Sequence, residues 1–169
     1  AKNGGFGGAP KFPPHGTLEF LIDRSRSRPD GSLSEPISVT LDAMWRGGFH
    51  DHIGGGFHRY ATDANWLLPH FEKMLYDNAQ LARVYAGAYE ISGDDNYREA
   101  VADIYRWLER EMTSPQGAFY SALDSGEVGE EGESYIWSNA QLQTALGEKD
   151  AALFAEVYEF EPEGNFNEE

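Results

Sequence analysis

The chain has 169 residues, of which 40% are hydrophobic and 14% aromatic, and this composition is typical of a globular domain large enough to bury a core. Its formal net charge of -16 excludes nucleic acid and anionic membrane surfaces as partners, because phosphate groups need a basic face. No cysteine is present, which excludes disulfides, thiol catalysis and thiolate metal sites within this chain, and no apolar run approaches the ~20 residues that span a bilayer.

Two short helices are predicted in the first fifty residues. The first sixteen residues are rich in glycine and proline, and they cannot form a regular helix. A helix is predicted from Thr17, a plausible N-cap. Ser34 is predicted to cap a second helix, with Pro36 in its first turn, and Gly47 and Gly48 end it.

Residues 47–80 carry the densest collection of functional side chains. This stretch holds four of the five histidines and a triple glycine at 54–56. Clusters of polar and aromatic residues on irregular chain indicate a functional loop held by a rigid scaffold. At least one of the three glycines is predicted to adopt a positive φ, which only glycine adopts without strain.

The helix predicted from Glu72 to Ser92 has two apolar stripes, so we expect it to be buried between neighbours on two sides. Asp77 lies in one of these stripes and is predicted to be at least partly buried. A buried carboxylate needs a partner or a raised pKa, and the candidate partners are Arg59, Lys73 or a histidine of the 50–58 loop. A half-exposed surface helix is predicted after the N-cap Asp94, ending before Pro115.

The last third of the chain is strongly acidic. A loop over residues 124–133 precedes a short strand predicted at 135–137. Ser138 and Gln141 form a capping-box pattern that opens a helix to Leu146, and a final helix is predicted from Asp150.

Four stretches, at residues 4–13, 47–81, 91–97 and 121–137, together resemble the spermatogenesis-associated protein twenty family. The resemblance implies an all-α fold, with helical hairpins that form part of a six-hairpin, glycosidase-like α/α toroid and a few short strands in loops. It also implies a thioredoxin-like domain upstream, so that residues 1–169 would be a toroid fragment lacking its remaining hairpins. One departure is Leu123-Asp124-Ser125, where the family motif has two aspartates around an alanine.

Carboxylates next to a histidine suggest acid–base chemistry on a sugar. Glycoside hydrolysis and sugar epimerisation both need a proton donor and a proton acceptor on either side of the substrate. The predicted catalytic residues are His70, Glu72, Asp77 and Asp63. The alternative is purely structural, with Glu72 capping the helix and Lys73 pairing with Asp77.

Flat rings interleaved with hydrogen-bond donors suit the two faces of a sugar. The residues predicted to contact a ligand are Phe57, His58, Arg59, Tyr60, Trp66, Tyr76, Lys11 and Asp124. The alternative for Phe57 and Trp66 is that they are core side chains beneath the loop.

Metal and phosphate sites are weaker interpretations of the same stretch. His50 with His52, and His70 with Glu72, are conceivable ligand pairs, but no HExxH motif is present and no metal or other cofactor is predicted. The triple glycine lacks the lysine and the strand–helix setting of a phosphate loop.

The function predicted is therefore a toroid that binds, and modifies as an epimerase or glycosidase does, a sugar-type ligand. The rival hypothesis is a non-catalytic module that binds partners or serves as a scaffold with the thioredoxin-like domain. Self-association of the fragment is expected, because missing hairpins would leave apolar surface uncovered. The absence of a secretory signal predicts a cytoplasmic protein.

Overall fold

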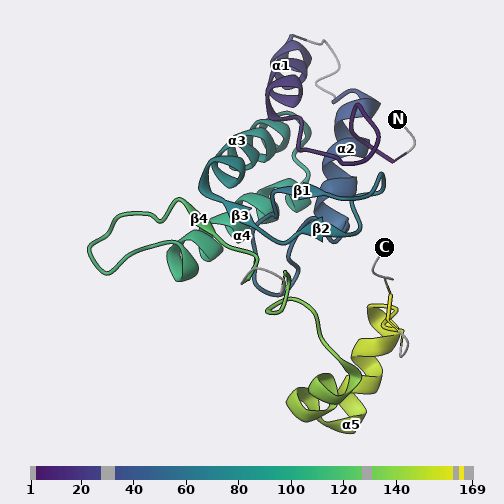
Figure 1. Cartoon of the computed structure of the whole chain (residues 1–169). Helices are drawn as coiled ribbons and strands as arrows, with labels where there is room; N and C mark the ends of the chain where they lie inside the picture. The colour runs from purple at the N-terminus through teal and green to yellow at the C-terminus, as the bar shows by residue number, and fades with distance from the viewer. Residues whose placement is uncertain (1–2, 28–32, 127–130, 162–163, 166–169) are drawn as a thin grey trace. The chain divides into compact units, whose positions relative to one another are not determined.

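The computed structural model describes residues 3–27, 33–126, 131–161 and 164–165 (Figure 1). It divides into two compact units, residues 1–125 and residues 126–169. The first unit holds α1 (His15–Arg26), α2 (Glu35–Arg46), α3 (Leu75–Ser92) and α4 (Asp95–Glu111). It also holds four two-residue strands: β1 (Tyr60–Ala61), β2 (Pro69–His70), β3 (Lys73–Met74) and β4 (Ala122–Leu123). The second unit holds α5 (Asn139–Val157).

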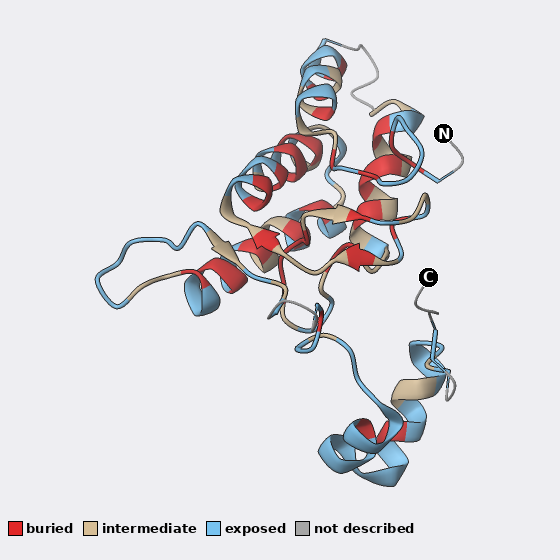
Figure 2. Cartoon of the chain, viewed as in Figure 1, coloured by how far each residue is buried: buried red, intermediate tan, exposed pale blue. Residues whose placement is uncertain are grey.

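Helix α3 is the central element of the first unit, because it packs against both α1 and α4. Figure 2 shows that buried residues line much of its length. Its buried side chains include Leu81, Val84 and Tyr85, while Arg83 and Glu90 remain on an exposed face. The prediction of neighbours on two sides is therefore confirmed. Both neighbours, α1 and α4, come from this chain.

Tight capping turns join α3 to α4. Gly93 adopts a left-handed conformation, with φ 68°, and its amide donates to Tyr89. Asp94 then caps α4 as predicted, its side chain accepting from the Asn96 amide at 2.9 Å. This connection makes α3 and α4 an antiparallel helical hairpin.

Helix α3 begins later than predicted, because the residues before it form a strand. Lys73 and Met74 pair antiparallel with Leu123 and Ala122, which commits their backbones to an extended conformation. Glu72 therefore lies outside the helix, and the expectation that it sits in the first turn is wrong. A second antiparallel pair joins β1 and β2, with Tyr60 opposite His70.

In the second unit, the capping box of Ser138 and Gln141 is confirmed. Gly147, with φ 77°, kinks α5 between the two helices that the sequence predicted. The strand predicted at residues 135–137 is wrong, since these residues lie at the end of a turn and in irregular chain, with no strand partner in the part of the chain described. No helix of the described residues is long and apolar enough to cross a membrane.

Candidate active site

The extended segments before α3 bring Arg59, Tyr60, His70 and Glu72 together, and we call these four residues the Glu72 cluster. The Arg59 guanidinium donates to Glu72 Oε2 at 2.7 Å, and His70 Nε2 lies 3.4 Å from the same oxygen. The β1–β2 pairing stacks the Tyr60 ring on the His70 ring, with centroids 4.9 Å apart. About a fifth of the Glu72 and His70 side chains remains exposed, so the cluster is open to a ligand.

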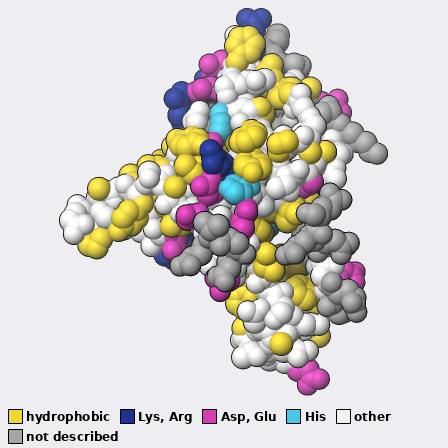
Figure 3. Space-filling view, in the orientation of Figure 1, with side chains coloured by type: hydrophobic (Ala, Val, Ile, Leu, Met, Phe, Trp, Pro, Cys, Tyr) yellow, Lys and Arg dark blue, Asp and Glu magenta, His cyan; other side chains and the backbone are white. Residues whose placement is uncertain are grey.

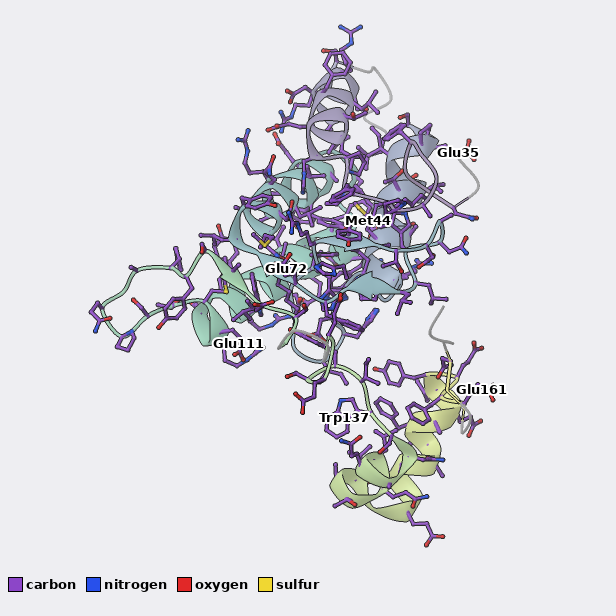
Figure 4. The ribbon with its side chains drawn as sticks, in the orientation of Figure 1. Glu35, Met44, Glu72, Glu111, Trp137 and Glu161 are labelled. Atoms are coloured by element: carbon purple, nitrogen blue, oxygen red, sulfur yellow. The ribbon has the colours of Figure 1, made fainter. Side chains whose placement is uncertain are left out.

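The surroundings of the cluster are aromatic. Phe12, which is 56% exposed, lies against Tyr60 with ring centroids 4.7 Å apart. Figure 3 shows histidine, cationic and acidic side chains gathered on one face amid hydrophobic ones, and Figure 4 labels Glu72 in the middle of the first unit. Charged groups framed by exposed rings are typical of a binding surface for a small polar ligand.

Asp77 extends the cluster from the first turn of α3. It is only 5% exposed, as the sequence predicted, and burial raises its pKa to about 6, with Arg59 lowering the pKa and Glu72 raising it. Its Oδ1 lies 3.6 Å from His15 Nε2, while its Oδ2 is buried without a hydrogen-bond partner. Of the predicted partners, Arg59 acts on Asp77 through its charge, whereas the side chain that faces the carboxylate is His15, from α1.

Lys73 forms a buried ion pair with Asp51. Its ammonium donates to Asp51 Oδ2 at 2.6 Å and to the Gly55 carbonyl at 2.8 Å, so the alternative pairing of Lys73 with Asp77 is wrong. Burial lowers the pKa of Lys73 in spite of the opposing attraction of Asp51. Burial by itself would raise the pKa of Asp51. The nearby charge of Lys73 and two backbone amides lower it by more, so the pKa of Asp51 lies below its ordinary value. This pair fixes the 51–55 loop.

The triple-glycine loop is held from α3 and α4. Gly55 and Gly56 have φ values of 77° and 75°, which confirms the predicted positive φ. Asp103 Oδ2 accepts from the Gly56 amide at 2.8 Å and lies 3.0 Å from His50 Nε2. The side chain of Asn78 both accepts from the Phe57 amide and donates to the Phe57 carbonyl. The roles of Asp51 and Asp103 were missed, because each depends on a partner distant in sequence.

Several predicted ligand contacts are instead buried. Phe57 and Trp66 have no exposed surface, so the alternative that they are core side chains is the one the structure shows. His58 is 2% exposed and contacts the Phe71 carbonyl at 3.0 Å, and burial is the main reason that its pKa falls to about 3. Lys11, also buried, donates to the carbonyls of Gly4 and Ala64. These four side chains hold loops in place, which corrects the prediction of Phe57 and His58 as ligand contacts, while Lys11 and Trp66 also line a pocket beside Phe12.

Asp63 has a comparable structural role. Its carboxylate accepts from the backbone amides of Asn65, Leu67 and Leu68, which closes the 63–68 turn. Tyr76 is half exposed and, after Glu72, contributes to the raised pKa of Arg59. Asp124 is exposed and directly follows Leu123, the strand partner of Lys73.

The described residues form no metal centre at the cluster, and a pocket lies beside Phe12. Among the described residues, no group of three or more histidine and acidic side chains is placed to hold a metal ion. A shallow pocket of about 160 Å³ borders Phe12 instead, and it is lined by the 5–14 segment and Trp66. Lys11 is the only charged side chain among the residues that line this pocket, whereas the Glu72 cluster holds an arginine, a histidine and a carboxylate.

Comparison with solved structures defines the class of the fold. A sugar epimerase from a ruminal bacterium superposes with a TM-score of 0.61 at 16% identity, covering 92% of this chain and 47% of that one. Cellobiose 2-epimerase from Spirochaeta thermophila gives a TM-score of 0.60 at 18% identity, covering 91% and 45%. The fold is therefore that of part of an α/α toroid, as predicted.

Sequence relatives then place the chain more closely. Spermatogenesis-associated protein 20 of Homo sapiens and that of Mus musculus are each 43% identical to it over 155 residues, which is 86% of this chain and 20% of the relative. An uncharacterised Caenorhabditis elegans protein is 36% identical over 181 residues, 96% of this chain and 25% of the relative. No family model matches. The chain is thus similar over most of its length to spermatogenesis-associated protein 20, as its motifs indicated, and it spans about a fifth of those relatives.

Proposed function

We propose that this toroid binds a sugar-type ligand at the Glu72 cluster and modifies it by acid–base chemistry of the epimerase or glycosidase kind. The observation that carries the proposal is Asp77, a buried carboxylate whose pKa is raised to about 6 within the electrostatic reach of the Arg59–Glu72 pair. Buried, incompletely paired carboxylates are costly, and they are concentrated at functional sites.

The two carboxylates have different environments, and this difference suits them to different tasks. Glu72 is in an ion pair with Arg59, at 2.7 Å, and about a fifth of its side chain is exposed. Asp77 is buried without a hydrogen bond to Oδ2, which favours the protonated form and places its pKa near the working range of a general acid or base. One ionised and one protonatable carboxylate is the combination that sugar chemistry uses.

The aromatic frame supports a sugar ligand in particular. Phe12, which is more than half exposed and lies against Tyr60, offers a ring beside the charged groups, and aromatic rings pack against the apolar side of a pyranose. His70, stacked on Tyr60 and close to Glu72, supplies a further titratable group. The solved neighbours are named as sugar epimerases, and at this level of identity their names add support only by analogy of fold.

A titration with sugars tests the proposal. The protein is titrated with D-glucose, D-mannose and cellobiose by calorimetry, and each mixture is analysed for epimerised or hydrolysed product. We expect saturable binding that Glu72→Gln weakens at least tenfold. The matched control is Glu99→Gln, since Glu99 also pairs with an arginine, Arg106, at 2.6 Å, but on the exposed face of α4. Absence of binding by every sugar would refute the proposal.

The alternative function is a non-catalytic toroid that binds a protein partner such as the thioredoxin-like domain. The exposed rings of Phe6 and Phe12, both more than half exposed, favour it because aromatic side chains are common in protein interfaces. Under this alternative, Phe6→Ser with Phe12→Ser would abolish co-purification with that domain. Glu72→Gln would leave it intact.

A further inference from the structure

His15 and Asp77 present two buried polar atoms that have no hydrogen-bond partner. His15 Nε2 and Asp77 Oδ2 are both shielded from solvent and unpaired. The ring nitrogen lies 3.6 Å from Asp77 Oδ1, which is just beyond hydrogen-bond length. Buried polar atoms are almost always paired in native proteins, so two unpaired atoms on one pair of side chains need a physical reason.

Packing holds the two side chains in this arrangement. His15 opens α1 directly after Pro13 and Pro14, and the helix is anchored by Leu18, which has no exposed surface. Helix α1 packs against α3, whose first turn carries Asp77. Because both side chains stand at the starts of helices that pack on each other, the spacing between them is set before any ligand arrives.

Asp77 also lies within electrostatic reach of the charged groups of the Glu72 cluster. Arg59 and Glu72 both act electrostatically on Asp77, one lowering and one raising its pKa. Burial lowers the pKa of the His15 imidazole, which therefore stays neutral near pH 7 and keeps one N–H donor. The His15 imidazole and the Asp77 carboxylate thus place one donor and one acceptor close together.

We propose that His15 and Asp77 together bind a single hydroxyl group of the ligand, with the hydroxyl donating to Asp77 Oδ2 and accepting from His15 Nε2. This assignment rests on the proposed function and adds His15, from α1, to the site. A hydroxyl group is both a donor and an acceptor, so it satisfies both buried atoms at once. A site built to hydrogen-bond a hydroxyl rejects the analogue that lacks it, because its polar atoms are then left buried and unpaired.

Monodeoxy sugars provide the test. The protein, His15→Phe and Asp77→Asn are each titrated with D-glucose, D-mannose and the monodeoxy analogues of both. For the wild type, we expect one analogue to bind at least tenfold more weakly than its parent sugar. For His15→Phe and Asp77→Asn, we expect the parent sugar to bind as weakly as that analogue binds the wild type. In each of these variants, the parent sugar and the analogue should differ in affinity by less than threefold.

The controls separate this proposal from the general one. His52→Gln replaces an exposed histidine and Asp95→Asn an exposed carboxylate in the first turn of α4, and both should bind like the wild type. If no sugar binds the wild type, the proposed function fails and this assignment with it. If sugars bind the wild type and the His15 and Asp77 variants bind them with the same affinity, only the assignment fails. The two buried atoms are then bridged by water alone. Thermal melting checks each fold, and His15→Gln replaces His15→Phe if the ring variant does not fold.

Discussion

Replacing Asp77 with asparagine should stabilise the protein at neutral pH. The carboxyl has an ordinary pKa of 3.8 and a folded-state pKa raised to about 6 by burial. The folded state therefore binds more protons than the unfolded state between about pH 4 and pH 6. By linkage, the free energy of unfolding falls as pH rises through that window, and above it the full cost of the buried charge is present.

The magnitude follows from the same two pKa values. The difference between 3.8 and about 6, at about 1.4 kcal/mol per pH unit, gives an upper bound of roughly 3 kcal/mol. Asparagine has nearly the same shape and no charge, so it should recover about 1–3 kcal/mol at pH 7. Near pH 4 the wild-type carboxyl is itself protonated, and the difference between the two proteins should vanish. The other titratable groups that act on Asp77 are His15, Arg59 and Glu72.

Urea unfolding of the wild type and Asp77→Asn at pH 4.5, 5.5 and 7 measures this difference. Asp95→Asn is the matched control, because Asp95 is an exposed carboxylate in the first turn of α4 and its removal should change the free energy of unfolding by less than ~0.5 kcal/mol. A loss of stability in Asp77→Asn at pH 7, equal at all three pH values, would refute the reasoning. It would show that the carboxylate only holds the start of α3.

Three further predictions concern the loops and the assembly state. Gly56→Ala should lower the free energy of unfolding by about 1–3 kcal/mol, because φ is 75° and a Cβ would meet the Trp107 ring at 2.8 Å. Gly16→Ala is the control, because the space around Gly16 is open and its stability should not fall. Thermal melting compares the two variants. Lys73→Met should lower the free energy of unfolding, measured in urea, by about 3 kcal/mol, because Asp51 is left buried without its partner. Adding Asp51→Asn to the same chain should restore part of this loss. A double variant whose loss equals the sum of the two single losses would contradict the prediction. Self-association remains expected from the exposed apolar side chains of α5, and light scattering showing a monomer at all concentrations would refute it.

The amino-acid sequence by itself determined the helices and their caps. Apolar spacing located α3 and its buried face, and Asp94 and Ser138 marked the starts of two helices, because these signals lie within a few residues of the element that they define. The positive φ of the glycine loop was equally local. The long motif at 47–81 indicated the family and, through it, the toroid fold.

Only the tertiary structure decided which polar groups meet. The structural alternative paired Lys73 along a helix with Asp77, but strand pairing with Leu123 removes Lys73 from the helix and its ammonium reaches Asp51 instead. Asp77 faces His15, a residue that the sequence did not single out. Periodicity shows that a side chain is turned inward, but the partner it finds depends on which elements pack together, and that is set by the burial of the whole core.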